Sequence, residues 1–188
     1  SPTPTEPAPD YVDDFSNPGS GWPTGDTGTY HYGYLNGEYQ ILLKEGGWLA
    51  WVSPGMTVSD GRLDVYIRSA DSAYGAAGIL FGLSADASSY YVYLIGNGGF
   101  YSLQRIDDGV WTELIPWEWA DAIHQDAATN HLSIVQQDGT IILHANDETL
   151  NTVDIGHSVA GLVGLSAQSY DDPFDARFDN VSAYLPDA

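Results

Sequence analysis

The stretch YYVYLIGNGGFYSLQRIDDGVWTELIPW, residues 90–117, consists of three runs in which apolar and polar side chains alternate. Asn97-Gly98 separates the first two runs, and Asp108-Gly109 separates the last two. Alternation with a period of two is typical of β-strands, and Asn-Gly or Asp-Gly between two such runs favours a hairpin turn. The stretch therefore predicts three consecutive antiparallel strands.

The Asp108-Gly109 turn sets the register of the second hairpin. A two-residue type I′ loop places the residues that flank it directly opposite one another. We therefore expect Ile106 to lie opposite Trp111, and Gln104 to lie opposite Glu113. Side chains of directly opposite residues share a face of the sheet, so these four should lie together.

The same rule applied to Asn97-Gly98 places Tyr93 opposite Ser102 and Tyr91 opposite Gln104. The two registers together divide the sheet into a core face and an open face. The predicted core face holds Val92, Leu94, Tyr101, Leu103 and Leu114. The predicted open face holds Tyr91, Tyr93, Ser102, Gln104, Trp111 and Glu113.

Similar alternation continues along the rest of the chain, with Gly, Asn, Asp or Ser between the runs. Strands are expected near residues 11–15, 29–34, 38–43, 48–52, 61–68, 76–84, 89–95, 99–106, 110–116, 130–137, 140–145, 148–154, 161–167 and 176–185. Helical periodicity is nearly absent, apart from one short helical turn expected near 118–125. The pattern predicts an all-β, two-layer antiparallel sandwich of jelly-roll type.

Two further segments bear on the faces of this sandwich. In GRLDVYIR, Leu63, Val65 and Ile67 should point inward, which leaves Arg62, Asp64, Tyr66 and Arg68 on an outer face. In GGWLAWVSPG, Trp48 and Trp51 lie three residues apart and should point to opposite sides of a strand, so that one of them faces the core.

Residues 1–10, SPTPTEPAPD, alternate proline with small polar residues and predict an extended linker. Residues 11–188 are long enough for a single sandwich domain. No apolar run approaches the roughly 18 to 20 residues that cross a bilayer, so direct membrane insertion is not expected. A Pro/Thr-rich tether suits an extracellular or cell-surface protein.

The chain is strongly acidic and has no cysteine. Five Lys and Arg residues stand against 26 Asp and Glu residues, which gives a formal net charge of -21. Such a charge repels phosphate backbones and anionic lipid, so nucleic-acid and membrane-surface partners are disfavoured. The acids gather in turns, which is typical of a solvated surface, although calcium binding is the alternative for some of them.

Six segments, taken in order, resemble the concanavalin A-like, laminin G-like sandwich domains of bacterial lipoproteins and exported proteins. They are DDFSNPGSGW (13–22), YLNGEYQILL (34–43), RLDVYIRSADSAYGAAGILFGLS (62–84), YYVYLIGNGGFYSLQRIDDGVWTELIPW (90–117), NHLSIVQQDGTIILHANDETL (130–150), and GLVGLSA through FDNVSAYL (161–185). The resemblance covers nearly all of the chain after residue 10. It implies a concanavalin A-like fold.

The same superfamily contains laminarinase-type glycoside hydrolases. In these enzymes a structural calcium ion joins the first strand, an early glycine and an aspartate of the closing strand. Matching their opening and closing motifs to this sequence implies Asp14, Gly37 and Asp179 as calcium ligands, although Asp14 and Asp179 are equally suited to accept hydrogen bonds in turns. Their catalytic Glu-x-Asp-x-x-Glu strand has no counterpart here. The resemblance therefore does not imply hydrolysis.

Aromatic residues on an open sheet suggest a platform for sugar rings, since flat aromatic faces pack on apolar sugar faces while polar neighbours bond hydroxyls. The candidate ligand-binding residues are Tyr66, Arg68, Tyr91, Tyr93, Gln104, Trp111 and Glu113. We expect a non-catalytic extracellular carbohydrate-binding module. The alternative for the aromatic residues is that they are strand formers covered by the loops at 16–29 and 118–129.

Two other functions stay open at this point. One is a structural or adhesive surface domain whose partners are other surface proteins or copies of itself. The other is a glycoside hydrolase with an atypical carboxylate pair, such as Asp64 with Glu113. His131 and His144 should be diagonal neighbours on one face, but two imidazoles without a third ligand are typical of surface polar residues and predict no zinc site.

Overall fold

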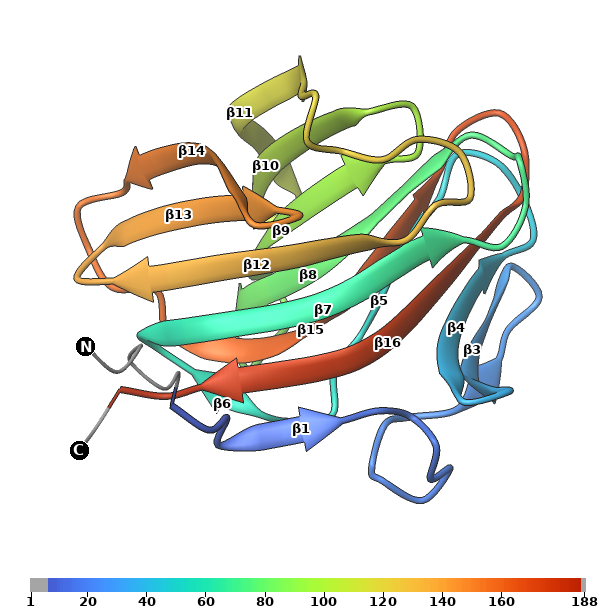
Figure 1. Ribbon diagram of the computed structural model, residues 1–188, viewed down its shortest axis with the longest axis horizontal. Helices are drawn as coiled ribbons and strands as arrows, with labels where there is room; N and C mark the ends of the chain where they lie inside the picture. The colour runs from blue at the N-terminus through green and yellow to red at the C-terminus, as the bar shows by residue number, and fades with distance from the viewer. Residues whose placement is uncertain (1–6, 187–188) are drawn as a thin grey trace, which may run out of the picture.

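In the computed structural model, which describes residues 7–186, two antiparallel sheets stack face to face (Figure 1). One has nine strands, in the order β14 (Glu148–Asp154), β13 (Thr140–Ala145), β12 (Asn130–Gln137), β7 (Gly61–Ser69), β16 (Phe174–Tyr184), β4 (Glu38–Leu43), β3 (Tyr30–Leu35) and β2 (Gly25–Asp26), with β1 (Tyr11–Asp13) paired to β16. In this sheet, β14 and β3 lie near opposite edges.

The second sheet has seven strands within the described residues. Their order is β11 (Val110–Trp119), β10 (Phe100–Asp107), β9 (Ser89–Gly96), β8 (Gly75–Leu83), β15 (Gly161–Ser169) and β5 (Leu49–Val52), with β6 (Thr57–Val58) paired to β15. The expected two-layer sandwich is confirmed. Every expected strand is present within a few residues, whereas β2 and β6 were missed because two residues are too short to show alternation.

The core lies between the two inner faces. Tyr39, Phe81 and Phe178 are fully buried there, together with aliphatic residues of both sheets. Trp22 closes one end, packing at 5.4 Å from the rings of both Phe15 and Tyr39. Burying this apolar area is the main favourable contribution to folding.

The helical turn expected near 118–125 was wrong. Glu118 and Trp119 end strand β11 instead, because Trp119 pairs with Phe100 of β10. A single turn follows, in which the Ile123 backbone N–H donates to the Ala120 carbonyl. The described residues contain no helix that is long and apolar enough to cross a membrane.

The expected register was right for β10–β11 and wrong for β9–β10. Ile106 lies opposite Trp111 as expected, but Tyr93 lies opposite Leu103 and Tyr91 opposite Arg105. The first turn has three loop residues, ending at Gly99 with a φ of 92° and a Gly99 N–H to Gly96 carbonyl bond. A type I turn followed by such a glycine bulge shifts the register by one residue.

This shift exchanges the two faces of β9. Tyr91 and Tyr93 face the core, at 7% and 0% exposure, while Val92 and Leu94 lie on the outer face. The Tyr93 hydroxyl donates to the His144 carbonyl across the sandwich at 3.0 Å. Neither tyrosine is available to a ligand on an open platform, contrary to expectation.

The remaining platform residues divide between two opposite surfaces. Tyr66 and Arg68 lie outward on β7 of the nine-stranded sheet, with Leu63, Val65 and Ile67 inward as expected. Gln104, Trp111 and Glu113 belong to the seven-stranded sheet. The single platform predicted from the sequence therefore does not exist.

The expectation for Trp48 and Trp51 was also wrong, because neither side chain enters the core. Ala50 and Val52 fill the inward positions of β5, and Trp51 packs on the outer face. Trp48 precedes the strand and is 45% exposed.

Residues 1–6 of the expected linker lie outside the described residues. Asp10, which was assigned to the linker, bonds to the sandwich instead. Its backbone N–H donates to the Ala183 carbonyl, and its carboxylate accepts the Leu185 N–H. Strand β1 itself begins at Tyr11, as expected, and Asp10 directly precedes it.

Tyr93 should be a stability residue. Tyr93→Phe removes the bond to His144 and should lower the free energy of unfolding by about 1 kcal/mol, whereas Tyr93→Ala leaves a cavity and should cost about 3–5 kcal/mol. Urea denaturation measures both. Tyr74→Phe, at a site that is 49% exposed, is the control and should change little; equal effects at the two sites would contradict the assignment.

Candidate functional site

The outer face of the seven-stranded sheet carries a second apolar cluster. Its buried members are Ala76, Leu80, Leu83, Val92, Leu94 and Ile106. Partly buried side chains cover them, namely Leu49, Trp51, Tyr90, Trp117, Leu162 and Tyr170. Four of these covering residues are aromatic, and because they are only partly buried their rings are partly exposed to solvent.

Two aromatic groups frame this face. The Trp51 and Tyr90 rings lie 6.1 Å apart. Burial raises the pKa of Tyr90, although a hydrogen bond from the Trp51 side chain opposes the shift. The Tyr170 ring lies 5.2 Å from Tyr74 and 6.5 Å from Trp117, and burial raises the pKa of Tyr170 as well.

A groove of about 560 Å³ follows the free edge of β5 and reaches this face at Trp51. Tyr30 and Tyr32 of β3 form one side, and the loop after β8 forms another. The residues that shape it include Pro23, Tyr30, Tyr32, Leu49, Trp51, Ser53, Leu83, Ser84 and Leu162. We call this hollow the β5 groove.

The lining of the β5 groove is aromatic, aliphatic or hydroxylic, and none of its described residues is charged. A negative charge lies just beyond it at Asp86, whose carboxylate accepts the hydroxyl of the lining residue Ser84 at 2.7 Å. Hydrogen bonds from Ser84 and Ser88 lower the pKa of Asp86 to about 2. Asp86 therefore stays ionised at any ordinary working pH.

Polar groups on the outer face are neutral in its centre. Gln104 is 5% exposed and donates to the Ser102 hydroxyl, which donates in turn to the Ile115 carbonyl. The Gln168 side-chain oxygen is buried and has no hydrogen-bond partner. Glu113 is exposed on the edge strand β11, opposite Gln104.

The outer face of the seven-stranded sheet has no acidic residue at the outward positions of its four central strands, within the described residues. The outward positions of the four central described strands are Leu162, Gly164, Ser166 and Gln168 of β15, Ala76, Gly78 and Leu80 of β8, Tyr90, Val92 and Leu94 of β9, and Ser102, Gln104 and Ile106 of β10. None is acidic. Retaining enzymes require two carboxyl groups about 5–5.5 Å apart.

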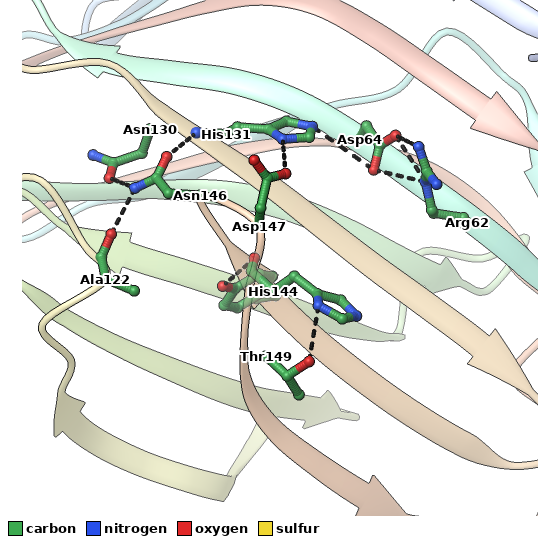
Figure 2. Close-up of polar contacts among 10 residues, drawn as sticks. Arg62, Asp64, Ala122, Asn130, His131, His144, Asn146, Asp147 and Thr149 are labelled. Atoms are coloured by element: carbon green, nitrogen blue, oxygen red, sulfur yellow. Dashed lines mark hydrogen bonds and ion pairs between the residues drawn. The ribbon is translucent and has the colours of Figure 1, made fainter. Parts of the chain in front are cut away.

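The opposite surface of the molecule, on the nine-stranded sheet, has a polar hollow of about 320 Å³ (Figure 2). Asp64, Ser133 and His144 form a row across β7, β12 and β13. Arg62 donates to the nearly buried Asp64 at 2.7 Å. Each of the three strands contributes an outward residue to this hollow, so the expected placing of Arg62 and Asp64 outward is confirmed.

His131 lies on the same surface and stacks on Tyr66, with ring centroids 4.6 Å apart. Its two ring nitrogens lie 3.9 Å from Asp64 and 3.7 Å from Asp147 (Figure 2). His144 is a diagonal neighbour, as expected, and bonds to Thr149 at 3.2 Å. Among the described residues, no three His, Cys, Asp or Glu side chains group as metal ligands.

Two asparagines hold the nearby loop to this sheet. The Asn146 amide donates to the Ala122 carbonyl and to the Asn130 side chain, both at 2.7 Å (Figure 2). Its oxygen accepts the His131 N–H at 2.8 Å. Asn130 bonds in turn to both backbone groups of His124. This network was not predicted from the sequence, because its members lie 6 to 24 residues apart and no local pattern joins them.

Arg68 belongs to an ion-pair group beside the polar hollow. It binds Glu38 through two nitrogens at 2.6 and 2.7 Å, and Arg177 lies 3.5 Å from the same carboxylate. Arg177 also pairs with Asp175 at 2.7 Å. The Arg68 guanidinium, which was expected to be a ligand-binding group, is therefore occupied by Glu38.

The expected calcium ligands lie near this group. Burial raises the pKa of Asp179, with further contributions from the charges of Glu38 and Asp14. Asp14 accepts the Ser16 N–H and hydroxyl, and Gly37 lies in the β3–β4 turn with a φ of 79°. Calcium binds oxygen ligands, but a full set here would need backbone or neutral oxygens besides the two carboxylates.

The chain therefore has the two-layer architecture of a concanavalin A-like sandwich, as the resemblance implied. No protein-family model matches it, and no curated protein matches it. Solved structures do: a carbohydrate-binding module from Bacillus subtilis has a TM-score of 0.61 at 18% identity, over 87% of this chain and 95% of that one. At this identity the likeness extends to the fold alone.

Two further solved structures are similar, one named as an enzyme and one of unknown function. Bacillus licheniformis β-glucanase has a TM-score of 0.68 at 11% identity, covering 96% of this chain and 100% of that one. A galectin-like protein of unknown function from Bacillus subtilis has a TM-score of 0.70 at 11% identity, covering 96% and 97%. Proteins that bind carbohydrate and proteins that cleave it thus share this fold.

Of the seven expected ligand-binding residues, the structure leaves Gln104, Trp111 and Glu113 together on the outer face of the seven-stranded sheet. Trp111 is 49% exposed there. Sequence reasoning missed Tyr90, Tyr170, Tyr30 and Tyr32. A register shifted by one residue at Asn97-Gly98 would have identified Tyr90, but nothing in the sequence places β3 beside β5.

His144 should make stability depend on pH. Burial lowers its pKa, and Arg62 acts in the same direction against the opposing charge of Asp64. The stabilising contribution of neutral His144 is complete above about pH 6.5 and is lost as the pH falls through the lower folded value. His144→Gln should therefore gain stability relative to the parent between pH 7 and pH 5.

Urea denaturation at several pH values measures this difference. At pH 8 both side chains are neutral, so the comparison there gives the packing effect alone and serves as the reference. A difference between variant and parent that stays constant from pH 8 to pH 5 would contradict the role of His144.

Proposed function

We propose that this protein is a non-catalytic carbohydrate-binding module that binds a glycan chain in the β5 groove and on the adjoining outer face. The observation that carries the proposal is the meeting of Trp51, Tyr30 and Tyr32 in one uncharged groove of about 560 Å³. Binding sites of this size are mostly aromatic and aliphatic with a few polar groups. The fold of the similar structures supports the same class.

Trp51 is the central residue of this proposal, because it lines the groove and also packs in the outer cluster with Tyr90. Its indole would stack on the apolar face of a sugar ring. The hydroxyls of Ser53 and Ser84 would bond to hydroxyls of the sugar. The absence of acidic residues from the outward positions of the central strands supports a binding role without hydrolysis.

Trp51→Ala should weaken glycan retention about tenfold or more, which corresponds to ~1.4 kcal/mol. A glycan array followed by calorimetry on the retained glycan measures the loss. Trp48→Ala is the matched control, since Trp48 is 45% exposed in the same segment but does not line the groove. Equal retention by the two variants, or an array without signal from folded protein, would count against the proposal.

An extracellular location and a structural calcium ion belong to the same proposal. The location rests on the Pro/Thr-rich segment at 1–10 and on the acidic composition. The ion rests on Asp14, Asp179 and the Gly37 carbonyl as oxygen ligands. Burial, and then the charges of Glu38 and Asp14, raise the pKa of Asp179, and a bound cation would offset both effects. If bound, calcium would supply a positive charge that joins the two ends of the chain.

Calcium should therefore raise the melting temperature of the parent protein, and chelator should reverse the rise. At a hundredfold excess over Kd the stabilisation would be about 2.7 kcal/mol. Asp179→Asn should abolish the calcium increment without lowering stability in chelator, because it also removes a repelled charge. Asp172→Asn, at an exposed turn, should keep the increment. A parent melting curve that ignores chelator would rule out the ion.

A second candidate function is supported by exposed apolar residues on the edge strand β11. Val110, Trp111 and Trp119 are 65%, 49% and 52% exposed, and Phe100 of β10 is 38% exposed. Exposed apolar groups along an unpaired strand edge favour contact with another protein. A structural or adhesive role would use this edge, which lies across the seven-stranded sheet from the β5 groove.

A further inference from the structure

The charges around the β5 groove bear on which glycans it can accept. The groove has no charged lining residue in the described chain, while the whole sequence has a net charge of -21. A ligand that enters the groove therefore meets neutral contacts inside and a negative potential outside. The negative potential lowers the affinity for anionic ligands and leaves the affinity for neutral ligands unchanged.

All five cationic side chains of the sequence are already bound to carboxylates. Lys44 pairs with Asp26, Arg105 pairs with Asp107, and Arg62 pairs with Asp64 (Figure 2). The other two, Arg68 and Arg177, share Glu38, and Arg177 also binds Asp175. An anionic sugar would have to break one of these pairs to obtain a charged partner.

None of these cations reaches the groove. Arg62, Arg68 and Arg177 lie on the outer face of the nine-stranded sheet, and Arg105 lies beside Tyr91 of β9. Lys44, at the end of β4, is held by Asp26 and by the Thr27 carbonyl. Phosphate, sulfate and carboxylate ligands are usually recognised through such side chains, and the groove offers none.

Asp86 adds a fixed negative charge at the groove rim. Its carboxylate is bonded to Ser84 and Ser88 at 2.7 and 2.8 Å, which keeps it beside the lining residues Ser84, Ala85 and Ala87. The charge acts through water, so its effect on an approaching anion is about twofold to fivefold and decreases as salt is added.

We infer that the β5 groove selects uncharged glycans and excludes anionic ones such as uronate-containing or sulfated chains, with Asp86 as a specificity-determining residue. This inference rests on the proposed glycan-binding function and narrows it to a ligand class. The contacts inside the groove are neutral, so affinity for an uncharged glycan is independent of ionic strength. Affinity for an anionic counterpart rises with salt.

The test uses a panel of neutral gluco-, galacto-, manno-, fructo- and xylo-oligosaccharides, each paired with its sulfated or carboxymethylated derivative. Binding of the whole protein is measured by array and then by calorimetry, at about 10 mM and about 500 mM salt, where the Debye length falls from roughly 30 Å to under 8 Å. At low salt we expect the affinity for the neutral member to be at least about tenfold higher than the affinity for the anionic one. This difference in affinity, which we call the gap, should narrow at high salt.

Asp86→Asn should reduce the ratio of neutral to anionic affinity at low salt by about twofold to fivefold. Affinity for the neutral member should not change, because asparagine keeps the oxygen that accepts the hydrogen bonds from Ser84 and Ser88. Glu148→Gln is the control, since it removes one charge from exposed β14. Strand β14 lies on the other side of the molecule from β3 (Figure 1), and β3 lines the groove. Glu148→Gln should leave the gap unchanged.

The outcomes separate this inference from the function on which it rests. An anionic member that binds as tightly as its neutral counterpart at low salt would overturn the selectivity while leaving glycan binding intact. Equal narrowing by Asp86→Asn and Glu148→Gln would overturn the role of Asp86. A panel on which the folded protein binds nothing at either salt concentration would overturn both the function and the inference.

Discussion

The turn Asn97-Gly98-Gly99 fixes the arrangement of the seven-stranded sheet. The Asn97 side chain donates to the Ala73 carbonyl and accepts the Gly75 N–H, so the turn is bound to the start of β8. The Asn97 carbonyl also accepts the Asp126 N–H from the loop after β11. The geometry of this turn decides which side of β9 faces the core, since a register shift of one residue moves every side chain of the strand to the opposite face.

The consequences of that turn extend to both surfaces of the sheet. With this register, Tyr93 joins the sandwich interior and reaches β13 through its hydroxyl, while Tyr90 turns outward to meet Trp51. Two glycines allow neighbouring strands of this sheet to approach closely. A Cβ atom at Gly78 or Gly164 would lie within 2 Å of a neighbouring carbonyl oxygen. These two glycines let the strands beneath the aromatic cover pack as they do.

The sequence allows the strands to be predicted because alternation is local, and it allows the Asp108-Gly109 turn to be predicted because Asp-Gly strongly favours type I′ geometry. Asp108 has a φ of 47°, as that turn requires. Asn97-Gly98 has the same local pattern, but it forms a type I turn with a glycine bulge instead of the expected type I′ turn. Hydrogen bonds of Asn97 with Ala73, Gly75 and Asp126 accompany this turn. Local patterns cannot report such distant partners.

The candidate site depends even more on distant contacts. Tyr30 and Tyr32 face the inner side of one sheet. They reach the groove only because β3, which is next to the edge strand β2, lies on the same side of the sandwich as β5, which ends the other sheet. Sequence reasoning identified the right kind of residue, aromatic with neutral polar neighbours, but it joined residues of two opposite surfaces into one platform. Which strands share a sheet is a property of topology that periodicity does not encode.

The distribution of charge follows from the same architecture. Acidic side chains gather in exposed turns, where water and ionic strength weaken their mutual repulsion. Four of the five cations lie on strands, and three of these four balance carboxylates that the sheet partly buries, as Arg62 does for Asp64. The open side between β3 and β5 has neither kind of charge in its lining, so it can take up apolar sugar faces without displacing an ion pair. A strongly acidic surface and a neutral groove are thus compatible in one molecule, because turns carry the first and strand edges form the second.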